Sequence, residues 1–489
     1  MLVETLLRAQ SQWPSKLAVD DGIRSLTYRR LALLAQVLRD VIRRETQGNR
    51  VGIMVPASGA FPGLLYGTFW AGKAAVPLNF LLNAGELGPI IEDAGLDLVI
   101  TIKHFSDIAA KLPARCLFLE ELSLRRKIFG RMLSRPPGPP TVDPDDTAVL
   151  LYTSGTTGSP KGVQLTYANL HSNCVDTRHS LDLDANQTFL NILPPFHVFG
   201  VTAMVLLPVM LGATVYAIPR FSPVALVKAV QTCGVTVLVA IPSMYAAVLK
   251  TKSTPPDTFE NIYMAISGGE PLPDNVRDGF AQRFGVKLHE GYGLTETSPV
   301  ISANTRAAHK DGSVGKPVRN VRVRIVGEHG ESCSPEQPGE ILVQSPGIMK
   351  GYLNKPAETN EVMTADGWFR TGDIGVMDED GFLYITSRKK EMLIIGGENV
   401  FPREIEAVLE NHAGVLQAAV IGIPDELRGE APVAFVSPVA GETVSEQELR
   451  TFAKHSLAGF KVPKRIVIRE DLPAGPTGKI LKRRLYELL

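Results

Sequence analysis

Residues 150–163 read Leu-Leu-Tyr-Thr-Ser-Gly-Thr-Thr-Gly-Ser-Pro-Lys-Gly-Val, and this stretch indicates both the local fold and the kind of ligand bound. The apolar run at 148–151 is typical of a buried strand that ends in a loop. Glycines let backbone N–H groups approach an anion closely, while the hydroxyl groups and the Lys161 ammonium add further donors. The loop therefore predicts binding of a nucleoside triphosphate, although no Gly-Lys-Ser/Thr follows at the spacing of the common ATPase loop.

The phosphate contacts expected from this loop involve its hydroxyl residues, its glycines and its lysine. They are Thr153, Ser154, Gly155, Thr156, Thr157, Gly158 and Lys161. Taken alone, a stretch of this composition is equally typical of a linker between two elements. The segments that follow it along the chain decide between these two interpretations.

The composition is ordinary for a soluble globular enzyme. The chain has 489 residues, 44% of them apolar, which suffices for two or three domains with packed cores. Lysine plus arginine equals aspartate plus glutamate at 51 each, so we expect no nucleic-acid partner. The four cysteines lie far apart, and we expect reduced, mostly buried thiols. The first residues do not read as a signal peptide, so we expect a cytoplasmic location.

The N-terminal part alternates helical and strand patterns. Short apolar runs, typical of buried strands, lie at 50–55, 74–77, 96–102 and 116–119, with helical faces at 28–42 and 63–70. The same rhythm continues from 214 to 267, which predicts an α/β architecture of parallel strands and crossover helices. The apolar stretch 201–218 raises the question of a membrane span, but Pro208 and Gly212 divide it, so we expect a buried helix, turn and strand.

The rest of the chain predicts two further parts. Short β-rich runs and turns between residues 315 and 384 predict an antiparallel or barrel-like subdomain. Beyond residue 388 we expect a compact α+β segment, with one helix opened by Pro402 and another at the capping pattern Ser445-Glu-Gln-Glu448. We therefore predict a large N-terminal domain over 1–387 and a small C-terminal domain over 388–489.

Four later segments join the loop to make an ordered set of motifs. They read Glu-Gly-Tyr-Gly-Leu-Thr-Glu-Thr at 290–297, Trp-Phe-Arg-Thr-Gly-Asp at 368–373, Arg-Lys-Lys-Glu at 388–391 and Pro-Thr-Gly-Lys at 476–479. In this order the five motifs resemble the acyl-adenylate-forming superfamily of acyl-CoA synthetases, luciferases and peptide-synthetase adenylation domains. Among its members, fatty acyl-CoA and acyl-carrier-protein ligases are the most similar. The resemblance implies the two-part fold described above with a mobile C-terminal domain.

The resemblance also implies a nucleotide site. Asp373 would accept both ribose hydroxyls, Arg388 would contact ribose and phosphate, and Tyr292 would lie against adenine. As isolated residues, the aspartate and the arginine are more often part of a surface ion pair, and the tyrosine more often packs half-buried. Backbone near the adenine and the acyl group is expected from Gly268, Gly269, Glu270 and Gly293.

The chemistry implied is conversion of a carboxylate into a mixed anhydride with AMP. Lys479 would bridge the carboxylate oxygen and the α-phosphate. Glu296 would hold Mg²⁺ while Thr295 donates to the α-phosphate, although a lone glutamate is usually a surface residue. His197 stands where the family lines its acyl site, and we leave open whether it is a substrate gate or a packing histidine.

Transfer of the acyl group to a thiol is expected to need a second arrangement of the two domains. The resemblance implies rotation of the C-terminal domain about Lys390, after which Gly396 and Gly397 would join the tunnel for the thiol. Ser387 departs from the family pattern, since Asp or Gly commonly precedes Arg388.

The residues near His197 are apolar, which favours a hydrophobic acid: Phe196, Val198, Phe199, Val201, Met204 and Leu206. We therefore predict a ligase that uses ATP, Mg²⁺ and coenzyme A to activate a medium- or long-chain fatty acid. Ligation to acyl-carrier protein, an aryl-CoA ligase, or a non-catalytic acyl- or nucleotide-binding protein are the alternatives. The basic stretch 124–133 is either a solvated helix or a peripheral contact with an anionic membrane. The oligomeric state is left open.

Overall fold

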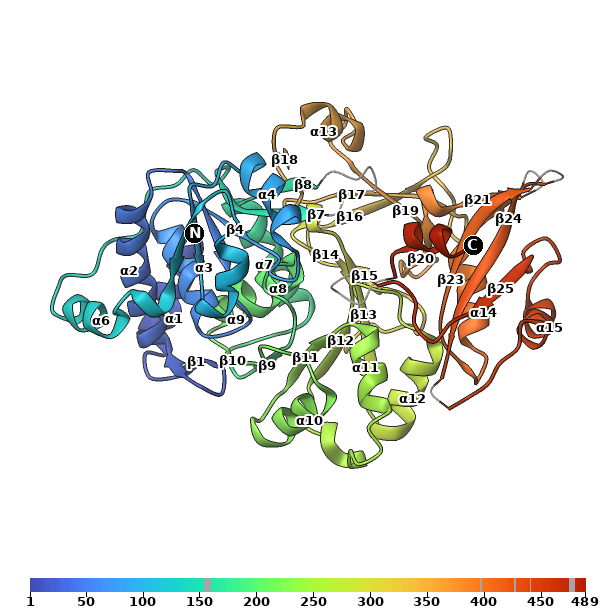
Figure 1. The fold of residues 1–489 in the computed structure, drawn as a ribbon, viewed down its shortest axis with the longest axis horizontal. Coiled ribbons are helices and arrows are strands. Elements are labelled where there is room, and N and C mark those ends of the chain that lie inside the picture. The colour runs from blue at the N-terminus through green and yellow to red at the C-terminus, as the bar shows by residue number, and fades with distance from the viewer. Residues whose placement is uncertain (154–159, 396–397, 426–427, 440, 475–479) are drawn as a thin grey trace.

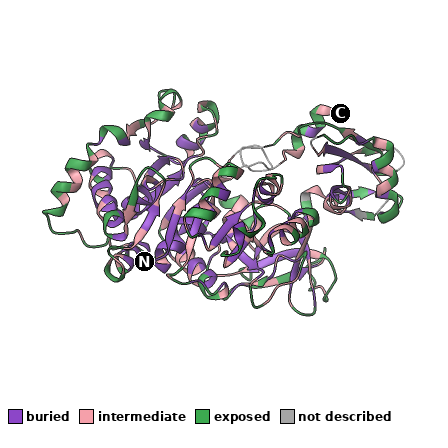
Figure 2. Cartoon of the chain, turned by 90° about the horizontal axis from the view of Figure 1, so that it is seen from below, coloured by how far each residue is buried: buried purple, intermediate pink, exposed green. Residues whose placement is uncertain are grey.

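The computed structural model describes residues 1–153, 160–395, 398–425, 428–439, 441–474 and 480–489, without the side chains of Lys390 and Asn399. In this part of the chain the strands form four sheets. Figure 1 shows the N-terminal helices and strands at one end of the molecule, a middle region of strands, and the C-terminal segment at the other end. Figure 2 shows that the strands are the most buried parts, while many helices are exposed on their outer faces.

One sheet has seven strands in the order β18-β8-β7-β4-β3-β5-β6. Strands β3 to β6 pair in parallel and β7 is parallel to β4, whereas β8 returns antiparallel to β7. The strands are β3 (Arg50–Met54), β4 (Ala74–Pro77), β5 (Leu98–Thr101), β6 (Arg115–Phe118), β7 (Thr147–Thr153), β8 (Lys161–Thr166) and β18 (Gly351–Tyr352). The helices of this region are α2 (Tyr28–Glu45), α3 (Ala60–Trp70), α4 (Ala84–Asp93), α5 (Ser106–Ala109) and α6 (Leu124–Met132), with single turns η1 (Lys103–Phe105) and η2 (Leu119–Glu121). The predicted parallel strands and crossover helices are confirmed.

A second sheet has nine strands in the order β15-β14-β13-β12-β11-β9-β10-β1-β2. Its central strands are parallel, because helices return the chain to the same edge each time. The strands are β1 (Leu17–Asp20), β2 (Ser25–Thr27), β9 (Thr188–Asn191), β10 (Thr214–Ala217), β11 (Val237–Ala240), β12 (Met264–Ser267), β13 (Leu288–Gly293), β14 (Val300–Ala303) and β15 (Lys316–Pro317). The helices and single turns are α1 (Leu2–Gln12), α7 (Tyr167–Ser180), α10 (Pro223–Thr232), α11 (Pro242–Leu249), α12 (Asp274–Phe284), η4 (Pro256–Phe259) and η5 (Thr295–Thr297).

The apolar stretch 201–218 is a buried helix followed by a strand, as predicted. It runs through α8 (Val198–Val201), a π-helical turn η3 (Thr202–Leu206) and α9 (Leu207–Leu211) into β10. The expected break at Pro208 is wrong, because the helical path continues through it after the π turn. The helix ends at Gly212, whose φ of 75° and close approach to the Trp13 ring suit glycine. No described helix combines the length and apolar character that crossing a bilayer requires.

The predicted β-rich region forms a four-stranded antiparallel sheet in the order β16-β17-β19-β20. Its strands are β16 (Arg322–Val326), β17 (Gly339–Gln344), β19 (Phe369–Met377) and β20 (Leu383–Arg388), and helix α13 (Pro356–Val362) lies between β18 and β19 in the sequence. Figure 1 shows this sheet between the two large sheets and the C-terminal segment. The region therefore joins the two halves of the molecule.

The C-terminal segment has its own sheet and its own core. The strands are β21 (Leu393–Ile395), β22 (Glu398–Val400), β23 (Val415–Asp425), β24 (Gly429–Pro438) and β25 (Arg465–Ile468). The helices and single turns are α14 (Pro402–Glu410), α15 (Glu446–Ser456), α16 (Lys482–Leu485), η6 (Lys389–Glu391) and η7 (Tyr486–Leu488). Ile405 and Leu409 of α14 are fully buried, and Ser445 and Glu448 form the predicted capping box. The predicted fold class is confirmed, while the boundary between 387 and 388 stays a prediction.

The cysteine prediction is only partly right. All four thiols are free, as expected. Only Cys174 is buried, whereas Cys116, Cys233 and Cys333 are half-buried. The expectation of mostly buried thiols is therefore wrong, because three of them lie on elements near the surface rather than in the core.

Candidate active site

Asp373 is the centre of a buried polar cluster in the middle of β19. The strand pairing sets Asp373 opposite Arg388 of β20, and the Arg388 Nε lies 3.1 Å from the Asp373 Oδ1. The Tyr292 hydroxyl, at the end of β13, donates to the other carboxylate oxygen at 2.6 Å. The Asp373 side chain is only 4% exposed, so its carboxylate contacts these two neighbours and little water.

Tyr292 therefore contacts the predicted ribose-binding aspartate directly. Burial, and next the charge of Asp373, raise the pKa of Tyr292 well above its usual range. The phenol thus remains a hydrogen-bond donor throughout the physiological pH range. Gly293 follows it at a point where a Cβ would lie 2.0 Å from the Pro299 carbonyl oxygen, so only glycine fits this close approach.

Glu296 lies in the turn η5, four residues after Tyr292, and is half-buried rather than exposed. The Tyr352 hydroxyl of β18 donates to the Glu296 Oε1 at 2.8 Å, and the Met349 N–H donates to the Glu296 backbone oxygen at 2.8 Å. Burial, and next the Glu296 charge, raise the pKa of Tyr352. Thr295 begins the same turn and is half-buried. The turn therefore holds the carboxylate in a defined place.

Lys161 and Thr153 face each other across the β7–β8 pair, so they mark the two ends of the predicted phosphate loop. The Lys161 ammonium forms an ion pair with Glu358 of α13 and lies 4.9 Å from the centroid of the Tyr352 ring. The hydrogen bond from Lys161 lowers the pKa of Glu358. Tyr352 thus contacts Lys161 with its ring and Glu296 with its hydroxyl. Neither Tyr352 nor Glu358 belongs to a motif that sequence reasoning selected.

His197 precedes α8 and lies among aromatic rings. Its ring centroid is 4.7 Å from that of Phe196, which in turn is 4.9 Å from that of Phe80. The His197 Nε2 is shielded from solvent and has no hydrogen-bond partner among the described residues. Burial lowers the pKa of His197 to about 4, so the imidazole is neutral at pH 7. Phe80 also lines a surface cavity of about 310 Å³.

The segment after β12 lies between the helix after His197 and strand β13. A Cβ on Gly268 would meet the Phe199 ring at 3.4 Å and the Gly291 carbonyl oxygen at 3.3 Å. Gly269 has a φ of +85°, which favours glycine, and Glu270 is half-buried. The structure therefore brings this segment against both the helix after His197 and strand β13.

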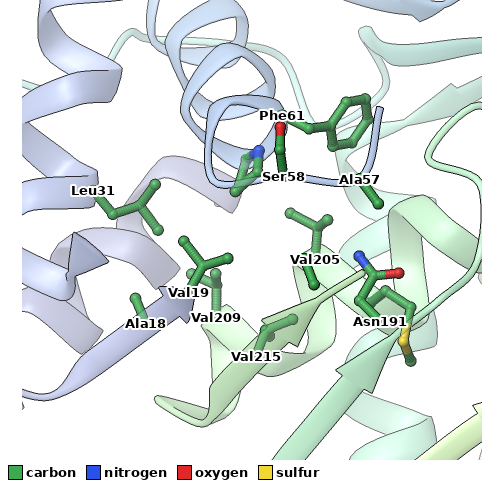
Figure 3. Close-up of a pocket in the computed structure, with 13 residues that line it drawn as sticks. Ala18, Val19, Leu31, Ala57, Ser58, Phe61, Asn191, Val205, Val209 and Val215 are labelled. Atoms are coloured by element: carbon green, nitrogen blue, oxygen red, sulfur yellow. The ribbon is translucent and has the colours of Figure 1, made fainter. Parts of the chain in front are cut away.

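A small cavity has one wall formed by the helix that begins after His197 (Figure 3). Val205 and Val209 come from that helix, and Val19 and Val215 come from the neighbouring strands β1 and β10. Its volume of about 20 Å³ holds about one water molecule. No predicted nucleotide-binding residue of the described ranges lines it, so it belongs to the core beside this helix.

Several predicted residues lie outside the described part of the chain. They are Ser154, Gly155, Thr156, Thr157, Gly158, Gly396, Gly397 and Lys479, together with the side chain of Lys390. Their roles stay predictions. Among the described candidates, one contact group contains Tyr292, Asp373 and Arg388, and a second contains Lys161 and Glu296, joined through Tyr352.

Comparison with known proteins agrees with the order of the motifs. The chain matches the family model of AMP-binding enzymes over residues 6–353 and the model of their C-terminal domain over residues 404–479. It is 37% identical to a feruloyl-CoA synthase of Amycolatopsis sp., with 96% of this chain and 95% of that protein covered. It is 34% identical to a long-chain-fatty-acid–CoA ligase of Bacillus subtilis strain 168, with 99% and 94% covered.

The fold agrees with a solved structure as well. The O-succinylbenzoate coenzyme A synthetase of Bacillus subtilis, in complex with ATP and magnesium ion, superimposes with a TM-score of 0.86 at 28% identity and covers 99% of both chains. These matches confirm the resemblance to acyl-adenylate-forming enzymes that the motifs indicated. The chain therefore belongs to the family of AMP-binding enzymes, and it is an AMP-forming acid–thiol ligase.

Proposed function

We propose that this enzyme joins a hydrophobic carboxylic acid, most of all a medium- or long-chain fatty acid, to coenzyme A through an acyl-AMP intermediate. The observation that carries the proposal is the buried Asp373 carboxylate, with Tyr292 on one oxygen and Arg388 on the other. A buried aspartate within a sheet, contacted by two donors, suits recognition of the paired hydroxyls of a ribose.

The first step joins the acid to AMP. A carboxylate oxygen attacks the α-phosphorus of ATP, an O–P bond forms, and the bond to the β-phosphate oxygen breaks to release pyrophosphate. Lys161 and the loop after Thr153 would hold the β- and γ-phosphates, and Thr295 would donate to the α-phosphate. Lys479 would arrive from the C-terminal domain to neutralise the charge that develops between acid and phosphate.

Glu296 suits a role in binding Mg²⁺ together with the nucleotide. Its carboxylate is held by Tyr352 near Lys161, where the phosphates are expected. Among the described residues no three histidine, cysteine, aspartate or glutamate side chains gather as a protein-only metal site requires. Magnesium in nucleotide sites is usually bound by one or two carboxylates together with phosphate and water, which suits this lone carboxylate. The ion would neutralise phosphate charge.

The second step makes the thioester. The thiol sulfur bonds to the acyl carbon, the bond to the AMP oxygen breaks, and the thiol proton leaves. Rotation about Lys390 would replace Lys479 by the segment that contains Gly396 and Gly397. We favour coenzyme A over acyl-carrier protein as the acceptor, because the relatives found are named as CoA ligases. Both ATP and coenzyme A are available in the cytoplasm, where we place the reaction.

Apolar surroundings support a hydrophobic acid. Phe196 lies beside His197 and Phe80 lies beside Phe196, and the His197 imidazole is neutral, so this side offers the acid little charge. A fatty acid and a cinnamate-like aromatic acid both suit such a surface. The similarity to a feruloyl-CoA synthase makes an aryl-CoA ligase the second candidate.

Exchange of pyrophosphate with ATP, measured over a panel of fatty and cinnamate-type acids, tests the proposal. We expect fatty acids to stimulate the exchange most strongly. If aromatic acids stimulate it most strongly instead, the enzyme is the aryl-CoA ligase of the second candidate function. Asp373→Asn should raise the KM for ATP about tenfold or more, because a charge-assisted contact to ribose is lost.

Asp380→Asn is the matched control, since Asp380 is exposed in the turn between the same two strands. No exchange with any acid of the panel, or an unchanged KM in Asp373→Asn, would contradict the proposal.

A further inference from the structure

Helix α6 presents its two faces to different surroundings. Leu124 and Ile128, one turn apart, pack against the core, and Arg131 forms an ion pair with Asp40 of α2. Phe129 and Met132 of the same helix are largely exposed to solvent. Figure 1 shows α6 at the edge of the molecule, beyond α2 and at the opposite end from the C-terminal segment. No labelled helix or strand lies beyond α6 at this edge in Figure 1.

The outer face carries an unusual amount of exposed apolar surface. Phe129, Met132 and Leu133 are 67%, 63% and 76% exposed. They account for three of the ten large hydrophobic side chains that are exposed in the described part of the chain. Single exposed hydrophobic residues are common on proteins, but a cluster within five positions marks a surface that another phase or molecule covers.

Positive charge surrounds this apolar cluster. Residues 122–142 contain five arginines and lysines and no acidic residue, in a chain whose formal net charge is zero. Arg125, Arg126 and Arg135 are exposed and Lys127 is half-buried, and the fifth cation is the Arg131 paired with Asp40. No ion pair is found for the other four within the described residues. The surface therefore combines an apolar centre with unneutralised cations.

We propose that the outer face of α6, with Leu133, binds the surface of an anionic lipid bilayer. An apolar cluster of this size inserts among acyl chains at the headgroup boundary, and lysine and arginine beside it attract anionic headgroups. A nucleic acid would match the cations but leave Phe129, Met132 and Leu133 exposed to water, so it fits less well. Figure 1 shows α6 far from β19, the strand that contains Asp373, and the role of this surface does not depend on which acid the enzyme activates.

Co-sedimentation of the full chain with vesicles tests this surface. We expect binding to vesicles of phosphatidylcholine with about one third phosphatidylglycerol, weakened by salt, and little binding to phosphatidylcholine alone. The variant Phe129→Ser/Met132→Ser/Leu133→Ser should bind the anionic vesicles at least about tenfold more weakly. The variant Arg125→Gln/Arg126→Gln/Lys127→Gln should bind them about a hundredfold more weakly, because each cation near the surface contributes about fivefold.

Matched controls change exposed residues elsewhere. Ile23→Ser/Val224→Ser removes two exposed hydrophobic side chains, and Arg483→Gln/Arg484→Gln removes two exposed cations of the last helix. Both controls should bind as the wild type does, and all variants should keep pyrophosphate exchange measured without vesicles. Absence of wild-type binding to anionic vesicles, equal binding of the α6 variants, or binding to duplex DNA that vesicles do not compete would overturn the proposal.

Discussion

Lys161 already has its charge matched by a carboxylate. Glu358 of α13 pairs with it, and the Lys355 ammonium lies 3.4 Å from the same glutamate. A phosphate that enters the loop must therefore replace Glu358 as the partner of Lys161, or share the lysine with it. The Tyr352 ring contacts Lys161 and its hydroxyl contacts Glu296, so Tyr352 would hold the ammonium in place while phosphate replaces Glu358.

Removing the charge of Glu358 should favour ATP. We expect Glu358→Gln to lower the KM for ATP about threefold, since a partly exposed ion pair holds Lys161 only weakly. Initial rates of pyrophosphate exchange at varied ATP give this value. Glu361→Gln, an exposed change on the same helix, is the control. A higher KM in Glu358→Gln would show instead that the glutamate holds Lys161 in its binding position.

Helix α14 is fixed by buried ion pairs. Arg403 lies 2.8 Å from Glu410 and 3.8 Å from Glu406, and Lys482 of α16 lies 2.8 Å from Glu406. The carboxylates also accept backbone N–H groups of β23, with Val420 bound to Glu406 at 2.8 Å. These contacts hold helix, sheet and C-terminal helix together.

Loss of Arg403 should destabilise the C-terminal segment strongly. Arg403→Ala removes positive charge beside the two buried carboxylates of Glu406 and Glu410, so we expect the free energy of unfolding to fall by about 3–5 kcal/mol. Urea unfolding measures it. Arg469→Ala, at an exposed position of the same segment, should cost at most about 0.5 kcal/mol. Similar values for the two variants would mean that the ion pairs add little to the packing of α14.

Helices and strands were largely predictable, because their hydrophobic periods are local properties of the sequence. The apolar runs that became β3 to β6 and the capping box at Ser445 are examples. Pro208 is the exception. A proline usually ends a helix, but the π turn before it changes the hydrogen-bond spacing and lets the helical path continue. That adjustment depends on the surrounding packing and leaves no local pattern.

The N-terminal part and the C-terminal segment meet where α12 contacts α14. The Asn275 amide of α12 donates to the Glu410 backbone oxygen of α14 at 3.4 Å. Close to this contact Glu290 is buried, and burial raises its pKa to about 7, although the charges of Arg277 and Arg403 act in the opposite direction. A carboxyl group that titrates near neutral pH thus lies where the two parts meet.

Stability should therefore fall with rising pH because of Glu290. Its pKa in the folded protein is above the usual 4.5, so the folded chain binds this proton more tightly than the unfolded chain does. The contribution of protonated Glu290 to the free energy of unfolding is fully present below about pH 4.5. It is lost as pH rises to about 7, a change of about 3 kcal/mol. Thermal unfolding of wild type and Glu290→Gln between these pH values measures the difference.

Only the wild type should lose this part of its stability as pH rises from about 4.5 to about 7. Glu290→Gln should be the more stable of the two above neutral pH, because a neutral side chain then replaces a buried charge. Parallel curves for the two proteins would show that Glu290 has an ordinary pKa in the folded chain.

By itself the sequence determined the order of the motifs, the α/β rhythm and the family, because short motifs and hydrophobic periods can be recognised without the tertiary structure. Only the tertiary structure decided which side chains hold the site. Tyr352 reaches Glu296 across 56 positions and Tyr292 reaches Asp373 across 81. The exposure of Phe129 on α6 was likewise decided by packing against α2. Such contacts follow from how strands and helices pack in space, and local periodicity carries no record of them.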